Sequence, residues 1–210
     1  MLTTDERDPQ TIATKCRIRD EAELLFGHFG YSKTSVSDIA KACSMSTGNI
    51  YRFFRNKQAV GISVVENYFD EQAQKMLDAR HGTTGSTEAK MLATVGAGIL
   101  HLVETMAGNP RIFEMAEFIC EDPDGEAILD THRRFKHQVL TELVAEGVEA
   151  GEFISDDPVR DGWTLLLVTT AFWMPQALVA WHDETMILDD LQDVLKMSLA
   201  GLKQDLVNPL

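Results

Sequence analysis

The segment from Thr34 to Lys57 constrains this chain more than any other, because it reads as two short helices joined by a tight turn. Thr34 or Ser35 offers a hydroxyl that can cap the first helix, and Asp38 follows in its first turn. Ser46 can cap the second helix. Apolar side chains at helical spacing anchor the pair, namely Val36, Ile39, Ala40, Cys43, Ile50, Phe53 and Phe54. The pattern predicts a helix-turn-helix unit.

The outward face of the second short helix carries hydroxyl, amide, phenol and guanidinium groups, which suit phosphate oxygens and base edges in a major groove. The residues that we expect to contact DNA are Thr34, Ser35, Ser46, Thr47, Gly48, Asn49, Tyr51, Arg52, Arg55 and Lys57. We expect base reading mainly from Ser46, Thr47, Asn49 and Arg52, and phosphate contacts from Thr34, Tyr51, Arg55 and Lys57. From the residues alone, a merely solvated polar face is the alternative.

The chain from Ile18 to Lys57 resembles the TetR family of transcriptional regulators. The positions that carry the resemblance are Ile18, Ala22, Leu25, Phe26, Gly30, Tyr31, Thr34, Ser35, Val36, Ile39, Ala40, Ser46, Gly48, Ile50, Tyr51, Phe54 and Lys57. Cys43 and Ser44 depart from the Ala and turn Gly that are usual there, and Arg19 and Glu21 occupy usually apolar sites. In a left-handed turn, Ser44 costs about 1 kcal/mol that glycine would avoid. The resemblance implies a homodimer whose fourth helix links ligand binding to the spacing of two DNA-binding heads.

Charge is distributed unevenly along the chain. The formal net charge is −14, which taken alone argues against a nucleic-acid partner. Residues 1–57 carry nine Lys or Arg and seven Asp or Glu, a net charge of +2, whereas the remaining 153 carry ten and 26, a net charge of −16. Basic groups are therefore concentrated where DNA would dock, and the acidic remainder favours a single docking orientation.

The composition is that of a globular intracellular protein. Hydrophobic residues make up 44% of the 210 residues, which is ample for a core. No run of about 18 apolar residues occurs, and the acidic start MLTTDERDPQ differs from a signal peptide, so we expect a cytoplasmic location. The cysteines lack metal-ligand spacing, so we expect reduced thiols, no metal site and no cofactor.

Helical periodicity predicts an all-α fold of about nine helices, because no convincing strand or repeat interrupts it. We expect a DNA-binding head over residues 1–57 and a ligand-binding and dimerisation body over residues 58–210. Loops are expected at Arg80–Thr87 and Glu121–Gly125, and Asp157 before Pro158 is a good helix start. Outside the helix-turn-helix, the expected helices cover residues 11–29, 58–79, 87–107, 111–121, 125–150, 158–181 and 186–206.

The segment Trp163–Trp181 is apolar on nearly all sides, so more than one of its faces must be buried. One face can contact the core and another a second subunit, as the family resemblance also implies. A thick core within one chain is the alternative. The expected residues of a homodimer interface are Ala177, Leu178, Trp181, Leu188, Leu191 and Leu195.

Pro175 lies inside the same segment and predicts a kink near Ala171 to Trp173, because proline cannot donate a backbone hydrogen bond. A kink opens space for a pocket that aromatic and methionine side chains would suit to an apolar or aromatic small molecule. The expected lining residues are His101, Met106, Phe113, Glu117, Phe118, Trp163, Phe172, Trp173 and Gln176. A buried Glu117 would select a cationic ligand. The alternative for most of these residues is ordinary core packing.

The sequence gives little support to an enzyme. Glu114, Glu117 and Glu121 form an acidic stripe without a pair of histidines at ligand spacing, and no nucleophile lies beside a base. We expect a ligand-responsive homodimer, acting as a repressor at a near-palindromic DNA operator. The alternative is a helical protein-protein interaction adaptor that does not bind DNA, and activation instead of repression is a variant that the sequence does not separate.

Overall fold

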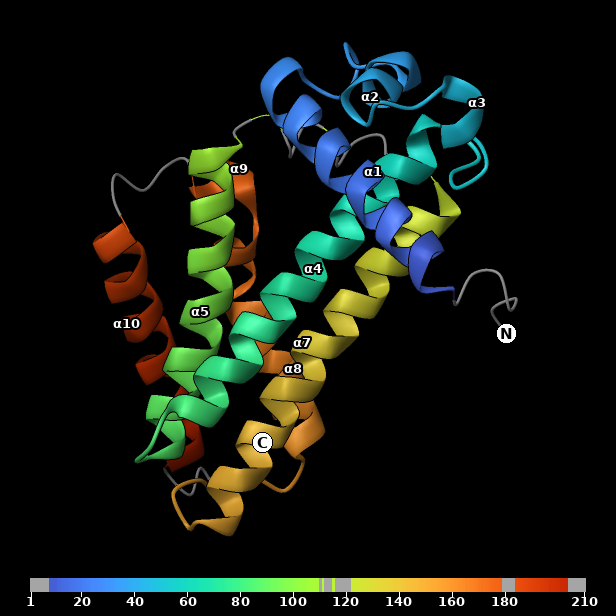
Figure 1. Ribbon diagram of the computed structural model, residues 1–210. Helices are drawn as coiled ribbons and strands as arrows, with labels where there is room; N and C mark the ends of the chain where they lie inside the picture. The colour runs from blue at the N-terminus through green and yellow to red at the C-terminus, as the bar shows by residue number, and fades with distance from the viewer. Residues whose placement is uncertain (1–7, 110, 112–114, 116–121, 179–183, 204–210) are drawn as a thin grey trace. The chain divides into compact units, whose positions relative to one another are not determined.

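The computed structural model describes residues 8–109, 111, 115, 122–178 and 184–203 (Figure 1). All regular structure in these residues is helical, which confirms the all-α prediction. The chain forms two compact units: unit 1 comprises Met1–Phe69 and Thr105–Leu129, and unit 2 comprises Asp70–Glu104 and Asp130–Leu210. This grouping differs from a simple division after residue 57, because three long helices each run from one unit into the other.

Unit 1 contains helix α1 (Pro9–Phe29), α2 (Val36–Ala42) and α3 (Thr47–Ile50). The helix α1 begins two residues earlier than expected, because Asp8 accepts a hydrogen bond from the Thr11 backbone at 3.0 Å and Pro9 suits the first helical position. It ends at Gly30, whose φ of 89° is in the region that favours glycine. The helix α2 contacts both α1 and α3, as Figure 1 shows.

The core of unit 1 joins these helices to the first part of α4 (Lys57–Gly82). Phe26 is fully buried, and its ring meets the ring of Tyr31 edge-on with centroids 5.1 Å apart. Each large apolar side chain buried in this way contributes about 1.5–3 kcal/mol. The remaining core residues include Ile18, Ala22, Ile39, Ala40, Ile50, Val60, Val64 and Met115.

Three helices extend through both units: α4, α5 (Thr87–Gly108) and α7 (Pro123–Glu149). The helix α4 continues to Gly82 and α5 begins at Thr87, so the loop expected at Arg80–Thr87 is shorter than predicted. The helix α7 begins at Pro123 rather than at residue 125, because the Asp122 side chain accepts from the Asp124 backbone at 2.9 Å and proline suits a first turn. The helix expected over residues 111–121 lies almost wholly outside the described residues.

Unit 2 also contains α8 (Pro158–Val168), the 3-10 helix η3 (Thr170–Trp173), α9 (Pro175–Leu178) and α10 (Glu184–Lys203). Asp157 caps α8 by accepting from the Arg160 backbone at 3.1 Å, as predicted. The expected break before Pro175 is confirmed, and it starts earlier than predicted, at Thr169. There the Thr169 hydroxyl donates to the Leu165 carbonyl at 2.8 Å, and such back-bonding often bends helices.

The helix α5 is long and apolar enough to cross a membrane by length and composition alone. Met91, Val95, Ile99 and Leu102 are, however, buried within the protein. A helix with this pattern of burial is a core helix of unit 2.

Near the C-terminal end of α4, Arg80 pairs with Glu142 at 2.6 Å and also with Glu146. These ion pairs tie α4 to α7.

Candidate DNA-binding surface

The helix α2 is fixed at its start by a reciprocal cap. The Ser35 hydroxyl accepts from the Asp38 backbone at 3.2 Å, and the Asp38 carboxylate accepts from the Ser35 backbone at 3.0 Å. Hydrogen bonds from the Ser35 hydroxyl and backbone also lower the pKa of Asp38. Such a capping box satisfies two N–H groups that a helix start would leave unpaired. Ser35 is exposed, so it combines this role with a position on the surface.

The turn between α2 and α3 has the left-handed conformation considered for Ser44, whose φ is 51°. This is the one non-glycine residue with positive φ in the described chain. The Met45 backbone donates to the Ala40 carbonyl at 2.8 Å and closes the turn. The strain at Ser44 is therefore compensated by the hydrogen bonds and packing of the helix-turn-helix.

The helix α3 is only one turn long and starts at Ser46, whose hydroxyl accepts from the Asn49 backbone at 3.2 Å. Gly48 lies in it with an ordinary helical φ, and a Cβ placed there would meet no atom within 4 Å. Neither conformation nor packing within the chain therefore requires glycine, although glycine costs about 1 kcal/mol relative to alanine in a helix. Close approach of the backbone to an external partner, which the sequence predicts at Gly48, is one use of glycine that does not depend on the fold.

Several of the residues that we expect to contact DNA are exposed to solvent. Ser46, Gly48, Tyr51, Arg52 and Arg55 are exposed, and the Tyr51 side chain is 52% exposed although it is aromatic. Thr47 and Asn49, which we also expect to contact DNA, are half-buried. The Arg52 guanidinium donates to the Asn49 amide oxygen at 3.5 Å, so the two side chains lie together.

Two residues that we expect to contact phosphate also bond within the chain through their polar groups. Thr34 is buried, and its hydroxyl donates to the Gly30 carbonyl at 3.0 Å. The Lys57 ammonium donates to the carbonyls of Tyr31 at 2.9 Å and of Thr34 at 3.1 Å. It also lies 4.2 Å from the centre of the Tyr31 ring, and burial lowers its pKa. Both residues therefore hold the turn after α1 in place.

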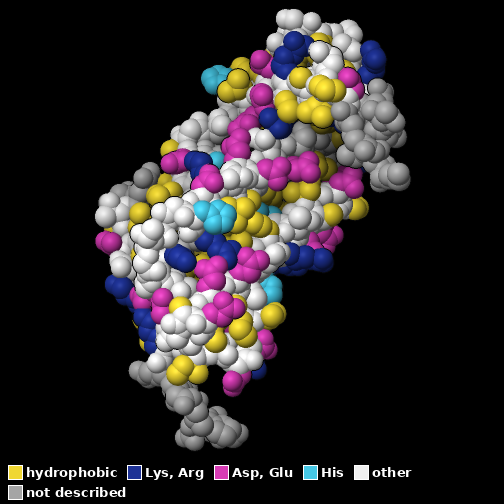
Figure 2. Space-filling view, turned by 60° about the horizontal axis from the view of Figure 1, so that its bottom comes forward, with side chains coloured by type: hydrophobic (Ala, Val, Ile, Leu, Met, Phe, Trp, Pro, Cys, Tyr) yellow, Lys and Arg dark blue, Asp and Glu magenta, His cyan; other side chains and the backbone are white. Residues whose placement is uncertain are grey.

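Arg55 is exposed but is paired within unit 1. Its Nη2 lies 2.7 Å from Asp124 Oδ2 and 3.9 Å from Asp122 Oδ2, at the start of α7. A DNA phosphate that approached Arg55 would compete with these two carboxylates. Basic and acidic side chains also intermingle more widely on the protein, and Figure 2 shows magenta and dark blue side chains side by side on the face that it presents.

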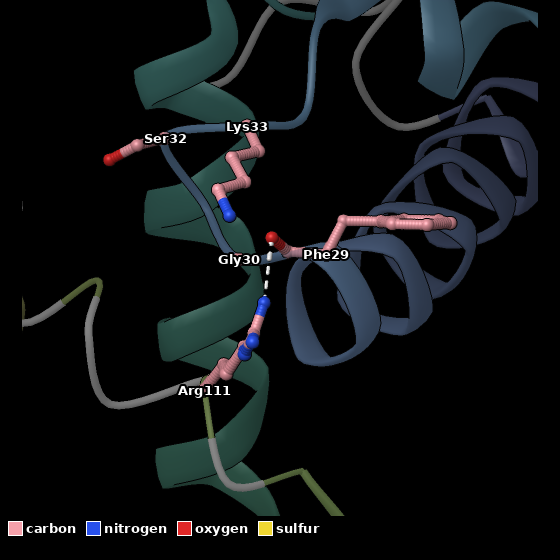
Figure 3. A pocket seen from close by; sticks show the side chains of 5 residues that line it. All are labelled: Phe29, Gly30, Ser32, Lys33 and Arg111. Atoms are coloured by element: carbon pink, nitrogen blue, oxygen red, sulfur yellow. Dashed lines mark hydrogen bonds between the residues drawn. The ribbon is translucent and has the colours of Figure 1, made fainter.

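A basic pocket of about 280 Å³ lies next to the end of α1 and is lined by Phe29, Gly30, Ser32, Lys33 and Arg111. Figure 3 shows Arg111 and Lys33 approaching the Phe29 carbonyl oxygen from two sides, while the Phe29 ring points away. The Arg111 Nη1 donates to that oxygen at 3.1 Å. The two cations could also donate hydrogen bonds to a phosphate oxygen. The sequence reading missed this pair, because the two residues are far apart in the chain and only the fold joins them.

The residues expected to line a ligand pocket are placed in several environments. His101 and Phe172 are buried in unit 2, and Trp173 is half-buried there. Trp163 is 40% exposed, with its ring edge-on to that of His137 at 5.3 Å, and Met106 belongs to unit 1. Three residues, Phe113, Glu117 and Phe118, and the side chain of Gln176 lie outside the described residues.

Three of the expected dimer contacts also need correction. Leu178, Leu191 and Leu195 are at most 4% exposed within a single chain, so their side chains already belong to its core. Ala177 and Leu188 are half-buried, and Trp181 lies outside the described residues. The large apolar side chains that are exposed between the start of α8 and the end of α10, among the described residues, are Val159, Trp163, Leu167, Val168, Met174, Met186 and Met197.

Glu104, near the end of α5, is a surface ion-pair residue. It accepts from the Lys75 ammonium at 2.8 Å, and this hydrogen bond lowers its pKa. Within the described ranges, no three His, Cys, Asp or Glu side chains are grouped so that they could hold a metal ion.

Two family descriptions match the sequence. Residues 18–61 match "Bacterial regulatory proteins, tetR family", and these residues contain the capped helix-turn-helix. Residues 88–195 match "Tetracyclin repressor-like, C-terminal domain", which extends from α5 into α10.

Individual proteins are similar over different lengths. The chain is 36% identical over 63 residues to the uncharacterized HTH-type transcriptional regulator YuxN of Bacillus subtilis, a match over 30% of this chain and only 22% of YuxN. It is 24% identical over 196 residues to the uncharacterized HTH-type transcriptional regulator YhgD of the same species, covering 91% of this chain and 93% of YhgD. The structure of the transcriptional regulator FadR from Bacillus subtilis in complex with stearoyl-CoA aligns with a TM-score of 0.65 and 17% identity. The alignment covers 89% of this chain and 98% of the FadR chain.

The two family matches together cover the head and most of the body. The chain therefore belongs to the TetR family of DNA-binding transcriptional regulators, which are not enzymes, with an N-terminal helix-turn-helix domain and a C-terminal ligand-binding domain.

Proposed function

We propose that this regulator is a repressor that binds a near-palindromic operator as a homodimer and leaves it when a small molecule binds in unit 2. The observation that supports the DNA-binding role is the surface formed by α3 and the two residues after it. There a Cβ on Gly48 would meet no atom within 4 Å, Tyr51 and Arg52 are exposed, and Arg52 bonds to half-buried Asn49. Two-fold symmetry would present two such faces to two half-sites.

The side chains divide into two groups by chemistry. Thr47, Asn49 and Arg52 carry hydroxyl, amide and guanidinium groups that can bond to base edges, so they determine which sequence is preferred. Tyr51 and Arg55 contact the phosphate backbone, and their contribution is independent of sequence. Thr34 and Lys57 act indirectly, because they fix the turn that precedes α2. An adaptor without DNA binding is set aside, since the family consists of DNA-binding regulators.

The small molecule is expected to have a large apolar part. Phe172 and Trp173 lie in the 3-10 segment before Pro175, and the Trp173 ring lies against Gly98 of the apolar helix α5. FadR from Bacillus subtilis, which shares the fold, was crystallised with stearoyl-CoA, a ligand with a long apolar chain. Binding of such an effector would act in the cytoplasm by favouring a conformation whose DNA-binding heads no longer fit the half-sites.

Selection from a random pool of double-stranded DNA tests this function. We expect enrichment of a near-palindrome, with an affinity that falls steeply with salt as phosphate contacts release counterions. Asn49→Ala should change the preferred sequence, whereas Ser37→Ala, on the exposed part of α2 and outside the proposed contacts, should not. Failure of the folded protein to enrich any sequence, with and without candidate effectors, would contradict the proposal.

A further inference from the structure

Lys136 on α7 is a partly buried cation that forms no ion pair with a carboxylate of the described residues. Its Nζ lies 4.3 Å from the centre of the Trp173 ring, a cation–π contact. No Asp or Glu in the part of the chain that the structure describes lies within ion-pair distance of it. Burial lowers its pKa to about 8, so the charged form still predominates at pH 7.

The other basic residues of unit 2 make this isolation significant. Those with a carboxylate partner are Lys75, Arg80, Lys90, Arg133, Arg134 and Lys203. Arg160 and Lys196 have no such ion pair among the described residues, but both are exposed to water. Lys136 thus has neither full hydration nor a counter-ion among the described residues, although residues 58–210 are rich in acidic groups, with 26 Asp or Glu and ten Lys or Arg. A cation in this situation is costly unless an anion joins it.

His132, one turn before Lys136 on α7, and its hydrogen-bond partner Gln72 are polar but uncharged. The Gln72 amide donates from Nε2 to the Gly98 carbonyl at 2.8 Å, which directs its oxygen to His132 Nε2 at 2.7 Å. That nitrogen must then carry the proton, and Nδ1 is the acceptor of a neutral ring. Burial, together with the charge of Lys136, lowers the pKa of His132 to about 3, so His132 is neutral at pH 7.

The surroundings are also fixed in shape. Trp173 packs against α5 at Gly98, where a Cβ would come within 2.8 Å of the indole ring and 2.9 Å of the Met76 sulfur. The indole nitrogen donates to the Thr169 hydroxyl at 3.3 Å, which holds the ring in its place under the ammonium. An indole plane, a neutral imidazole and one cation are therefore presented together by α4, α5, α7 and η3.

We propose that Lys136 binds the anionic group of the effector, so that the effector is an amphipathic carboxylate or phosphate whose apolar part lies against Trp173. The group Gln72, Gly98, His132, Lys136 and Trp173 is called the Lys136 site below. The proposal rests on the proposed function, since it specifies the class of molecule that unit 2 recognises. It replaces the expectation of a cationic ligand selected by Glu117, which lies outside the described residues.

The experiment uses the full-length protein without DNA and three probes with the same chain: dodecanoate, dodecyl phosphate and 1-dodecanol. Affinity is measured by calorimetric titration, and tryptophan emission, to which Trp163, Trp173 and Trp181 all contribute, is followed in parallel. The variants are Lys136→Met, which keeps the length and apolar stem of the side chain, and Lys136→Arg, which keeps the charge. Lys196→Met is the matched control, because Lys196 is an exposed lysine of the same unit.

We expect at least one anionic probe to bind the wild-type protein about tenfold or more tightly than the alcohol, the effect of one charge-assisted contact. Lys136→Met should remove this preference without weakening the binding of the alcohol, whereas Lys136→Arg and Lys196→Met should retain it. The stronger of the two anions then distinguishes a carboxylic acid from a phosphorylated effector.

Equal affinity for the alcohol and both anions, or an unchanged preference in Lys136→Met, would overturn the proposal and leave Lys136 with a packing role against Trp173. Absence of binding by both anions would overturn it as well. Thermal unfolding of each variant shows that it is folded. Because no DNA is present, enrichment of an operator together with a negative result here would refute the anion site and leave the repressor function standing.

Discussion

Arg55 and Asp124 form an ion pair, with 2.7 Å between Nη2 and Oδ2, that joins the end of the helix-turn-helix to the first turn of α7. Asp122, 3.9 Å from the same nitrogen, caps α7 and contributes a second negative charge. The exposed Arg55 guanidinium is thus attached to the helix that enters the ligand-binding unit. We propose that operator binding and this ion pair compete for the Arg55 side chain.

Asp124→Asn should therefore strengthen operator binding. The substitution leaves the Asp122 cap and removes the closer carboxylate, so Arg55 can turn to a phosphate. An exposed ion pair is worth at most about 1 kcal/mol, which corresponds to an increase in affinity of about twofold to fivefold. Titration of the selected operator measures it. Asp130→Asn is the control, because Asp130 pairs with Arg133 and Arg134 in unit 2. Weaker binding by Asp124→Asn would show that the pair instead holds Arg55 in position for DNA.

Gly48→Ala should separate stability from DNA binding. The added methyl group meets no atom of the protein within 4 Å, and alanine favours a helix, so stability should rise by about 0.5–1 kcal/mol. Operator affinity should fall, since the methyl group would lie between the α3 backbone and DNA. Urea unfolding and operator titration measure the two effects. Gly82→Ala, at the end of α4 and equally unobstructed, should leave operator affinity unchanged. Unaltered affinity in Gly48→Ala would mean that this backbone does not approach DNA.

The parts of the fold that the sequence predicted are those with local causes. Ser35 and Ser46 are recognisable caps, because each serine stands directly before a helical pattern. Its hydroxyl then bonds to a backbone N–H only three residues further along the chain. The break before Pro175 was likewise predicted from one residue that cannot donate a hydrogen bond, although it begins earlier, at Thr169. Such features survive into the structure because tertiary contacts do not oppose them.

The parts that were missed depend on contacts between distant residues. Lys57 looked like a DNA contact, but its ammonium reaches carbonyls 23 and 26 residues earlier in the chain. Leu191 and Leu195 were expected at a dimer interface, yet an apolar stripe on a helix cannot show whether its partner is the same chain or another copy. Lys136 became a candidate only when the fold placed it over Trp173 and away from every described carboxylate.

Ser44→Gly should stabilise the helix-turn-helix. The φ of 51° at Ser44 is unfavourable for a side chain and natural for glycine, so the gain should be about 0.5–1 kcal/mol after the extra entropy of the unfolded glycine chain is subtracted. Ser37→Gly is the matched control, because Ser37 is an exposed serine inside α2. Glycine at this helical position should destabilise the protein by about 0.5 kcal/mol. Denaturant unfolding at 25 °C measures both. A loss of stability in Ser44→Gly would show that the Ser44 side chain makes a compensating contact.

His132 should make stability depend on pH below neutrality. Its pKa falls from an ordinary 6.5 to about 3 in the folded protein, so the unfolded chain takes up a proton on this ring as the pH falls below about 6.5, while the folded protein stays neutral until about pH 3. Between these limits, this one residue should reduce the free energy of unfolding by up to about 1.4 kcal/mol per pH unit. Because carboxylates also titrate in this range, the wild-type curve alone does not isolate the histidine.

The comparison with His132→Gln does isolate it. Glutamine has no titratable group and can still donate to the Gln72 oxygen, which would otherwise be left buried without its partner. The difference in unfolding free energy between the two proteins should be constant above about pH 7 and should then shift steadily in favour of the variant as the pH falls towards 4. A His137→Gln variant provides the control, because His137 is a histidine of the same helix that bonds to the Val159 carbonyl in a more exposed position. A difference that stayed constant across the whole range would mean that His132 becomes protonated within the fold. The neutral state assigned to His132 in the Lys136 site would then be wrong.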